Sequence, residues 1–327
     1  MDSLIYSNPY SGQTFWGVIT QLIWRLWSLV TGDFSSLTFA SDEIQILVLI
    51  GVAASSALVG TFLVLRKMTM LANSLSHTIL IGIVLAFLWT NYSTDEHTSI
   101  NIHAMLIAAL LMGLITAFLT ELLTKWARLQ EDASMGLVFT TLFAIGVISL
   151  TLLTRNAHIG TEVVMGNVDA LQLDDCKLVY LILGLNILSF MIFFKEFKIT
   201  TFDSGLARAL GISPVFFSYL LMTQVSSTAI GAFRAVGVLM VLAFITAPPL
   251  TARLLTHQLK SMLYLSSAIG IIASIIGVAL SRHILTVYGV ALSTGGLVVC
   301  VLVVIYGCVV LVTQMRGYTV EKKSIKL

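Results

Sequence analysis

The chain carries little charge for its length. Of its 327 residues only 10% are Asp, Glu, Lys or Arg, whereas 57% are hydrophobic and the mean hydropathy is +0.98. Soluble globular proteins carry roughly a quarter charged residues. The shortage of charge excludes an ordinary soluble enzyme or a nucleic-acid-binding domain, and it leaves a protein that crosses a membrane many times.

Several other common features are also missing. The three cysteines, Cys176, Cys300 and Cys308, lack metal-type spacing, so we interpret them as small apolar fillers. Residues 1–9 are polar and have neither the basic start nor the apolar core of a secretory signal. No Gly-rich phosphate loop occurs, so ATP, if it is used, has to bind another chain. We expect no catalytic site and no permanently bound cofactor.

Long apolar runs dominate the chain. A membrane-spanning helix needs about 20 apolar residues, and nine runs approach that length. They predict an all-α, polytopic membrane protein with about eight to ten transmembrane helices. The predicted spans are approximately 45–65, 69–90, 103–124, 134–153, 177–194, 214–231, 234–252, 262–281 and 290–312. A tenth stretch, 14–30, holds Arg25 and three tryptophans, which favours a helix lying in the interface over a full span.

The basic residues are unevenly divided between the two sides of these spans. Thirteen of the 18 fall on one side, which is therefore predicted to be cytoplasmic. The remaining five fall on the other: Arg25, Arg155, Lys177, Arg234 and Arg282. We expect an extracytoplasmic or interfacial segment at 1–44, a transmembrane domain at 45–312 and a cytoplasmic tail at 313–327.

Two polar residues interrupt the second predicted span, in the stretch LANSLSHTIL at 71–80. Asn73 and His77 are four residues apart, so they share one face of a helix. Polar groups in hydrocarbon are costly and usually face a bundle interior or a wet path. The residues alone favour a packed core histidine at position 77, with a transport path as the alternative.

The longest predicted cytoplasmic connection is KEFKITTFDSGLARALGIS at 195–213. Asp203 is a good N-cap for a short helix that ends at Leu210, and Gly211 is a good stop. Together with the small residue Ala207, this pattern predicts a short helix able to dock in a groove of a partner protein. A plain surface helix is the alternative.

Five segments resemble, in order, the membrane subunits of zinc, manganese and iron ABC importers. The resemblance covers roughly 45–310. Its motifs are GTFLVLRKMTMLANSLSHTILIGI at 60–83, EDASMGLVF at 131–139, VVMGNV at 163–168, FDSGLARALGIS at 202–213 and GAFRAVGVLMVLAFITAPPLTARLL at 231–255.

The resemblance implies a permease subunit in a bacterial inner membrane. Such subunits pair with an identical or related permease, with cytoplasmic ATP-binding subunits and with an extracytoplasmic metal-binding protein. Residues 203–211 would form the coupling helix that receives ATPase movement, with Asp203, Ala207 and Gly211 at its matched positions. His77 would lie on the path of a divalent manganese, zinc or iron ion, which is cargo and not a cofactor.

The chain departs from the family at the proposed path. Relatives carry an Asp where this chain has Asn73, and an amide oxygen is a weaker ligand for a divalent cation than a carboxylate. Either the site is weaker than in relatives, or the missing charge comes from elsewhere, for example from Asp42 or Glu43. The Asp-x-Pro motif that relatives often carry near the last loop is also absent.

Three rival functions remain at this stage. A permease for chelated metal, of the siderophore or corrinoid type, would be favoured if 14–30 spanned the membrane. An ion-coupled secondary transporter would bury carboxylates near the membrane centre, and none of the sixteen acids falls there. An intramembrane hydrolase would need a nucleophile and base, and no such constellation is visible.

Overall fold

The protein is all-helical, as the sequence predicts. The computed structural model describes residues 9–10, 12–31, 40–70, 74, 81–82, 102–153, 168, 171 and 173–324, and these contain no β-strand. The helices are α1 (Phe15–Thr31), α2 (Ser41–Leu65), α4 (Ile102–Trp126), α5 (Glu131–Leu153), α7 (Leu173–Ile192), α8 (Phe194–Phe202), α9 (Ser204–Ala209), α10 (Pro214–Val236), α11 (Val238–Leu255), α12 (Leu259–Tyr288) and α13 (Thr294–Ser324).

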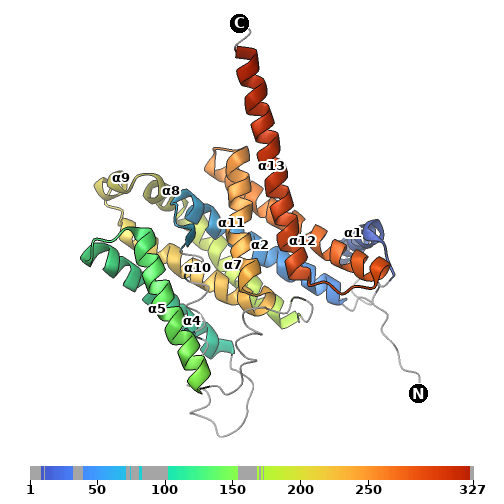
Figure 1. Cartoon of the computed structure of the whole chain (residues 1–327), viewed down its shortest axis with the longest axis horizontal. Helices are drawn as coiled ribbons and strands as arrows, with labels where there is room; N and C mark the ends of the chain where they lie inside the picture. The colour runs from blue at the N-terminus through green and yellow to red at the C-terminus, as the bar shows by residue number, and fades with distance from the viewer. Residues whose placement is uncertain are drawn as a thin grey trace.

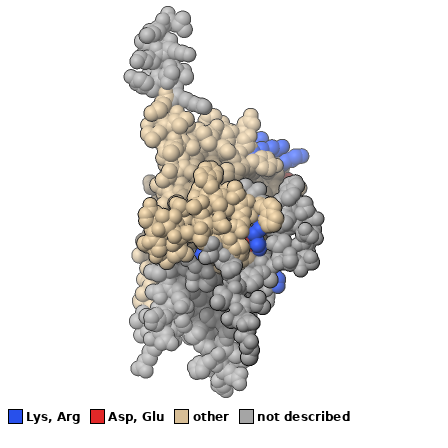
Figure 2. All heavy atoms as spheres, turned by 90° about the vertical axis from the view of Figure 1, so that its right-hand side faces the viewer, with Lys and Arg blue, Asp and Glu red and all other residues tan. Residues whose placement is uncertain are grey.

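Six of the described helices are long and apolar enough to cross a membrane, namely α2, α7, α10, α11, α12 and α13. Helices α4 and α5 occupy the third and fourth predicted spans. The second predicted span, 69–90, lies mostly outside the described residues. On the face seen in Figure 2, most described atoms belong to uncharged residues, as a lipid-facing surface requires. A polytopic helical membrane protein is thereby confirmed.

Helix α2 lies at the centre of the bundle. It packs against α7, α10, α11 and α12, and it crosses the middle of the view in Figure 1. The most apolar stretch of α2 is 78% buried within the chain, whereas the most apolar stretch of α13 is 17% buried. Helix α13 packs on α11 and α12 and then stands out from the body toward the C-terminus. Helix α2 is therefore the buried centre of the bundle, and α13 lies at its edge.

The backbones of α2 and α11 approach each other closely at Gly60. A Cβ built on Gly60 would lie 2.8 Å from the carbonyl carbon of Ile245, and closer still to its oxygen. In a regular helix the N–H of residue 249 would bond to that oxygen, but Pro249 has no N–H. The sequence predicts that Pro248 and Pro249 end or kink this span. The helix does not end there, since it continues to Leu255.

Polar side chains inside the bundle bond to one another between helices. The Asn186 amide on α7 donates to Ser55 Oγ on α2 and to Thr228 Oγ1 on α10, both at 2.7 Å. Thr61 Oγ1 and Ser266 Oγ link α2 to α12 at 3.1 Å. All five residues are buried. Such bonds satisfy groups that would be costly in hydrocarbon, and they set the register of α2 against three neighbours.

The spans predicted at 214–231 and 234–252 form helices α10 and α11, and a single residue, Gly237, separates the two helices. Gly237 has φ +80°, a conformation that side-chain-bearing residues rarely adopt, and its N–H bonds to the Phe233 carbonyl at 2.9 Å. Glycine at this position lets α10 stop and α11 start without a loop. Glu121 and Lys125, four residues apart near the end of α4, form an ion pair.

We expect Gly60→Ala to destabilise the protein, because the new methyl group meets a backbone carbonyl that cannot swing aside. Overpacking of this kind costs about 1–3 kcal/mol. The measurement is the thermal unfolding midpoint in detergent. The matched control is Gly184→Ala, since a Cβ at Gly184 meets no atom within 4 Å. Equal midpoints for the two variants would contradict the close packing of α2 on α11.

Candidate metal path and coupling segment

The two residues of the proposed path, Asn73 and His77, lie outside the described residues. Within their segment the structure describes Ser74 and, just beyond it, Ile81. The Ser74 hydroxyl donates to the Met135 carbonyl of α5 at 3.3 Å. Ile81 packs with Met112 of α4 and with apolar residues of α5. These contacts place both described residues against α4 and α5.

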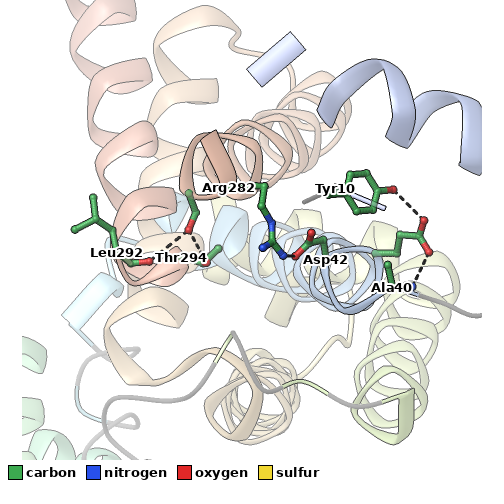
Figure 3. Close-up of polar contacts among 8 residues, drawn as sticks. Tyr10, Ala40, Asp42, Arg282, Leu292 and Thr294 are labelled. Carbon is green, nitrogen blue, oxygen red and sulfur yellow. Dashed lines mark hydrogen bonds and ion pairs between the residues drawn. The ribbon is translucent and has the colours of Figure 1, made fainter. Parts of the chain in front are cut away.

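The two carboxylates named as alternative sources of charge begin α2. Asp42 and Glu43 are 3% and 6% exposed. In the first turn they complement the positive end of the helix dipole. Asp42 forms an ion pair with Arg282 of α12, which Figure 3 shows pointing at the carboxylate. Glu43 forms an ion pair with Arg25 of α1. Both carboxylates thus already have cationic partners.

Glu43 also accepts two further hydrogen bonds. The Tyr10 hydroxyl donates to it at 2.9 Å and the Ala40 backbone N–H at 3.0 Å. Burial, reinforced by this bond to Glu43, raises the pKa of Tyr10 above its usual value, so the phenol stays protonated and remains a donor at neutral pH. Glu43 therefore ties the N-terminal segment and α1 to the start of α2.

A cavity of about 280 Å³ lies beside the Asp42–Arg282 pair. Polar side chains on its wall come from three helices: Gln45 of α2, Ser281 of α12 and Thr294 of α13. Thr294 Oγ1 donates to Ser281 Oγ at 3.1 Å, which closes the α12–α13 connection (Figure 3). The cavity could admit water or a small ion to the N-terminal end of α2.

Arginine side chains neutralise the two carboxylates at this end of α2. A metal ion could therefore bind Asp42 or Glu43 only after displacing a guanidinium group. Within the described part of the chain, no three His, Cys, Asp or Glu side chains gather into a group that could hold a metal ion.

Charge counting from the sequence had placed Arg25 and Arg282 on the same side as these acids. It could not tell which acid each arginine would meet, because the pairs are separated by 18 and 240 residues in the chain.

The proposed coupling segment folds as its residues predict, with one addition. Asp203 accepts from the backbone N–H groups of Gly205 and Leu206, both at 2.9 Å, and so caps α9. Gly211 follows the helix with φ +77°, and Ala207 is fully buried. The addition is α8, a second helix in the connection at 195–213, where the sequence predicted only the one at 203–210.

The outer face of the α9 segment is apolar. Leu206 and Leu210 are 49% and 58% exposed at the end of the bundle where α8 and α9 lie (Figure 1). Two exposed leucines on a short capped helix are suited to a complementary groove in a partner.

These features define a polytopic helical membrane protein. The chain belongs to the ABC 3 transport family, whose model matches residues 43–313. The family resemblance drawn from the five motifs is thereby confirmed.

Individual relatives include one that matches almost the whole chain. A "Probable metal transport system membrane protein" of Chlamydia muridarum is 39% identical over 318 residues, covering 97% of this chain and 98% of the relative. The manganese transport system membrane protein MntD of Bacillus subtilis is 40% identical over 70% of this chain and 79% of MntD. The zinc transport system membrane protein TroD of Treponema pallidum is 34% identical, covering 73% of this chain and 66% of TroD.

A solved structure has a similar fold. PsaBC from Streptococcus pneumoniae, determined in complex with Fab, matches with a TM-score of 0.71 and 26% identity, covering 89% of this chain and 95% of the solved chain.

We expect Asp42→Asn to lower stability, because it leaves Arg282 without its buried charge partner. Losing a hydrogen bond to a charged group costs about 1.5–3 kcal/mol. The fully buried value of about 3–5 kcal/mol is not reached, because Arg282 is 21% exposed and can be partly rehydrated. The measurement is thermal unfolding of Asp42→Asn, Arg282→Gln and the double variant.

A structural pair predicts that the double variant loses less than the sum of the two single losses. If instead Asp42→Asn abolishes metal uptake at unchanged stability while Arg282→Gln has no effect on either, then Asp42 is a metal ligand.

Proposed function

We propose that this chain is the permease subunit of an ABC importer that carries a divalent transition-metal ion, manganese or zinc, into a bacterial cell. The observation that carries the proposal is family membership over residues 43–313, together with relatives named for manganese and zinc transport. Iron, which the motifs alone left open, has no such support among these relatives. The chain itself performs no chemical reaction in this proposal.

The partners follow from the same proposal. ATP is hydrolysed by cytoplasmic ATP-binding subunits, a second permease subunit completes the membrane part, and an extracytoplasmic metal-binding protein delivers the ion. The capped α9 helix, with Leu206 and Leu210 exposed, supports a docking role for residues 203–211. Ala207, in the same helix, is buried against the chain body.

The ion path in this proposal passes His77, with Asn73 one helical turn away. An imidazole is a good ligand for manganese or zinc, and an amide oxygen is a weak one. Asp42 and Glu43 attract the cation as part of the polar end of α2, and they reach it directly only if Arg282 or Arg25 moves away.

The orientation follows from the positions of charge. The α8–α9 end carries Lys195, Lys198 and Arg208 and faces the cytoplasm, whereas the N-terminal end of α2 faces outward. Helix α13 starts beside the cavity at that outward end and is 31 residues long. At 1.5 Å per residue it spans about 46 Å, enough to cross the bilayer and bring the C-terminus to the cytoplasm.

ATP-driven uptake of manganese or zinc into proteoliposomes tests the proposal. The assembled transporter should take up one of these ions with its binding protein present, and His77→Ala should reduce uptake to the level of protein-free liposomes. The control is His257→Ala, which changes an exposed histidine at the α11–α12 junction. If proteoliposomes with the wild-type transporter take up neither manganese nor zinc, the proposed function is overturned. If the His77→Ala transporter takes up metal normally, His77 does not lie on the path.

The docking role of α9 has a separate test. We expect Leu206→Asp to release the ATP-binding subunit from the purified complex, because a carboxylate would be desolvated in an apolar groove. The measurement is the ATPase-to-permease ratio after affinity purification through the permease. Arg208→Gln, on the same exposed helix, should leave that ratio unchanged. Retention of the ATPase by Leu206→Asp would contradict docking through this face.

A further inference from the structure

Arg66 stands at the C-terminal end of α2, in a rigid turn. The backbone N–H of Lys67 bonds to the Val64 carbonyl at 3.2 Å, and that of Met68 to the Leu63 carbonyl at 2.9 Å. This pair of bonds is the Schellman ending of a helix, and it requires a left-handed residue. Lys67 takes that conformation with φ +60°. The turn therefore fixes the direction in which the Arg66 side chain leaves the helix.

The guanidinium of Arg66 reaches three hydroxyl groups on two other helices. Nη2 donates to Thr200 Oγ1 at 3.0 Å and Nε to Thr201 Oγ1 at 3.2 Å, both at the end of α8. Nη1 donates to Ser218 Oγ at 3.0 Å, near the start of α10. The Thr200 hydroxyl donates a hydrogen bond to the Glu196 carbonyl at 2.8 Å, so Thr200 Oγ1 can accept the bond from Arg66.

These contacts lie at both ends of the segment that carries α9. The chain leaves Thr201 at the end of α8, forms α9, and returns to Ser218 in α10. A single side chain of α2 thus holds the outgoing and the returning parts of this segment. Any displacement of α9 relative to the bundle has to move α8 or α10 against Arg66, or carry Arg66 with it.

We propose that Arg66 is the positioning residue that transmits displacement of α9 to α2. This inference rests on the proposed function, because it needs an ATP-binding subunit that pushes α9. Helix α2 is suited to receive the movement, since it is the buried centre of the bundle and touches α7, α10, α11 and α12. At its other end Asp42 and Glu43 link it to α12 and α1. Movement of α2 along its axis therefore reaches the outward end.

Arginine is required for this role, and a lysine would not serve. The planar guanidinium presents donors in fixed directions, so it bonds to α8 and α10 at once, whereas an ammonium is a point charge on a flexible stem. A residue that only anchored the helix to the membrane surface would tolerate lysine, because the positive charge is kept. The Arg66→Lys variant thus separates transmission from anchoring.

The test uses the complete transporter, with its ATP-binding subunits and binding protein, in proteoliposomes. Metal uptake and ATP hydrolysis are measured on the same sample, and the readout is the number of ions carried per ATP. We expect Arg66→Lys to lower this ratio by at least about fivefold, within the usual range of coupling between sites. Ser218→Ala and Thr201→Val should lower it in the same direction by removing one acceptor each. Lys67→Gln, which removes the neighbouring exposed charge, should leave it unchanged.

Three results would overturn the inference. The first is a normal ratio in Arg66→Lys. The second is a parallel loss of uptake and hydrolysis in all three variants, in proportion to the amount of assembled complex, which would give Arg66 a purely structural role. The third is a wild-type complex that hydrolyses ATP without carrying metal, which would overturn the proposed function and the inference together. A wild type that transports while Arg66→Lys hydrolyses ATP without transport supports both.

Discussion

A charge is costly inside a helical bundle, where neither water nor lipid headgroups can solvate it. Helix α2 is buried on most sides and carries its charged residues only at its two ends. Asp42 and Glu43 at one end find Arg282 and Arg25, and Arg66 at the other end finds hydroxyl groups of α8 and α10. The need to satisfy these groups decides which neighbours meet the ends of α2, and the rest of the bundle is arranged around it.

Between its charged ends α2 is held by contacts that tolerate little change. Gly60 lets the backbone approach the Ile245 carbonyl that Pro249 leaves without its usual donor. Ser55 shares Asn186 with Thr228, which connects three helices at one buried point. Because lipid offers no hydrophobic force between helices, shape and hydrogen bonding have to supply the specificity. Close packing and buried hydrogen bonds therefore hold α2 firmly in the bundle.

The ion pairs change how the charge at the start of α2 is understood. From the motifs, Asn73 in place of an acid suggested that Asp42 or Glu43 supplies the missing negative charge. The structure shows both carboxylates paired with arginines, and Glu43 accepting from Tyr10 as well. An ion pair has no net charge and attracts a cation only weakly. The main role of these two acids is therefore to hold α1 and α12 on α2.

The amino-acid sequence by itself determined the helical class, the approximate spans, the cap at Asp203 and the stop at Gly211, because these depend on apolar length and on local hydrogen bonding. It did not reveal that α8 is helical, since that depends on packing against neighbours. The partners of Asp42 and Arg66 were decided only by the tertiary structure. Their groups come from helices far apart in the chain, and only the folded bundle brings opposite charges and free hydroxyls within bonding distance.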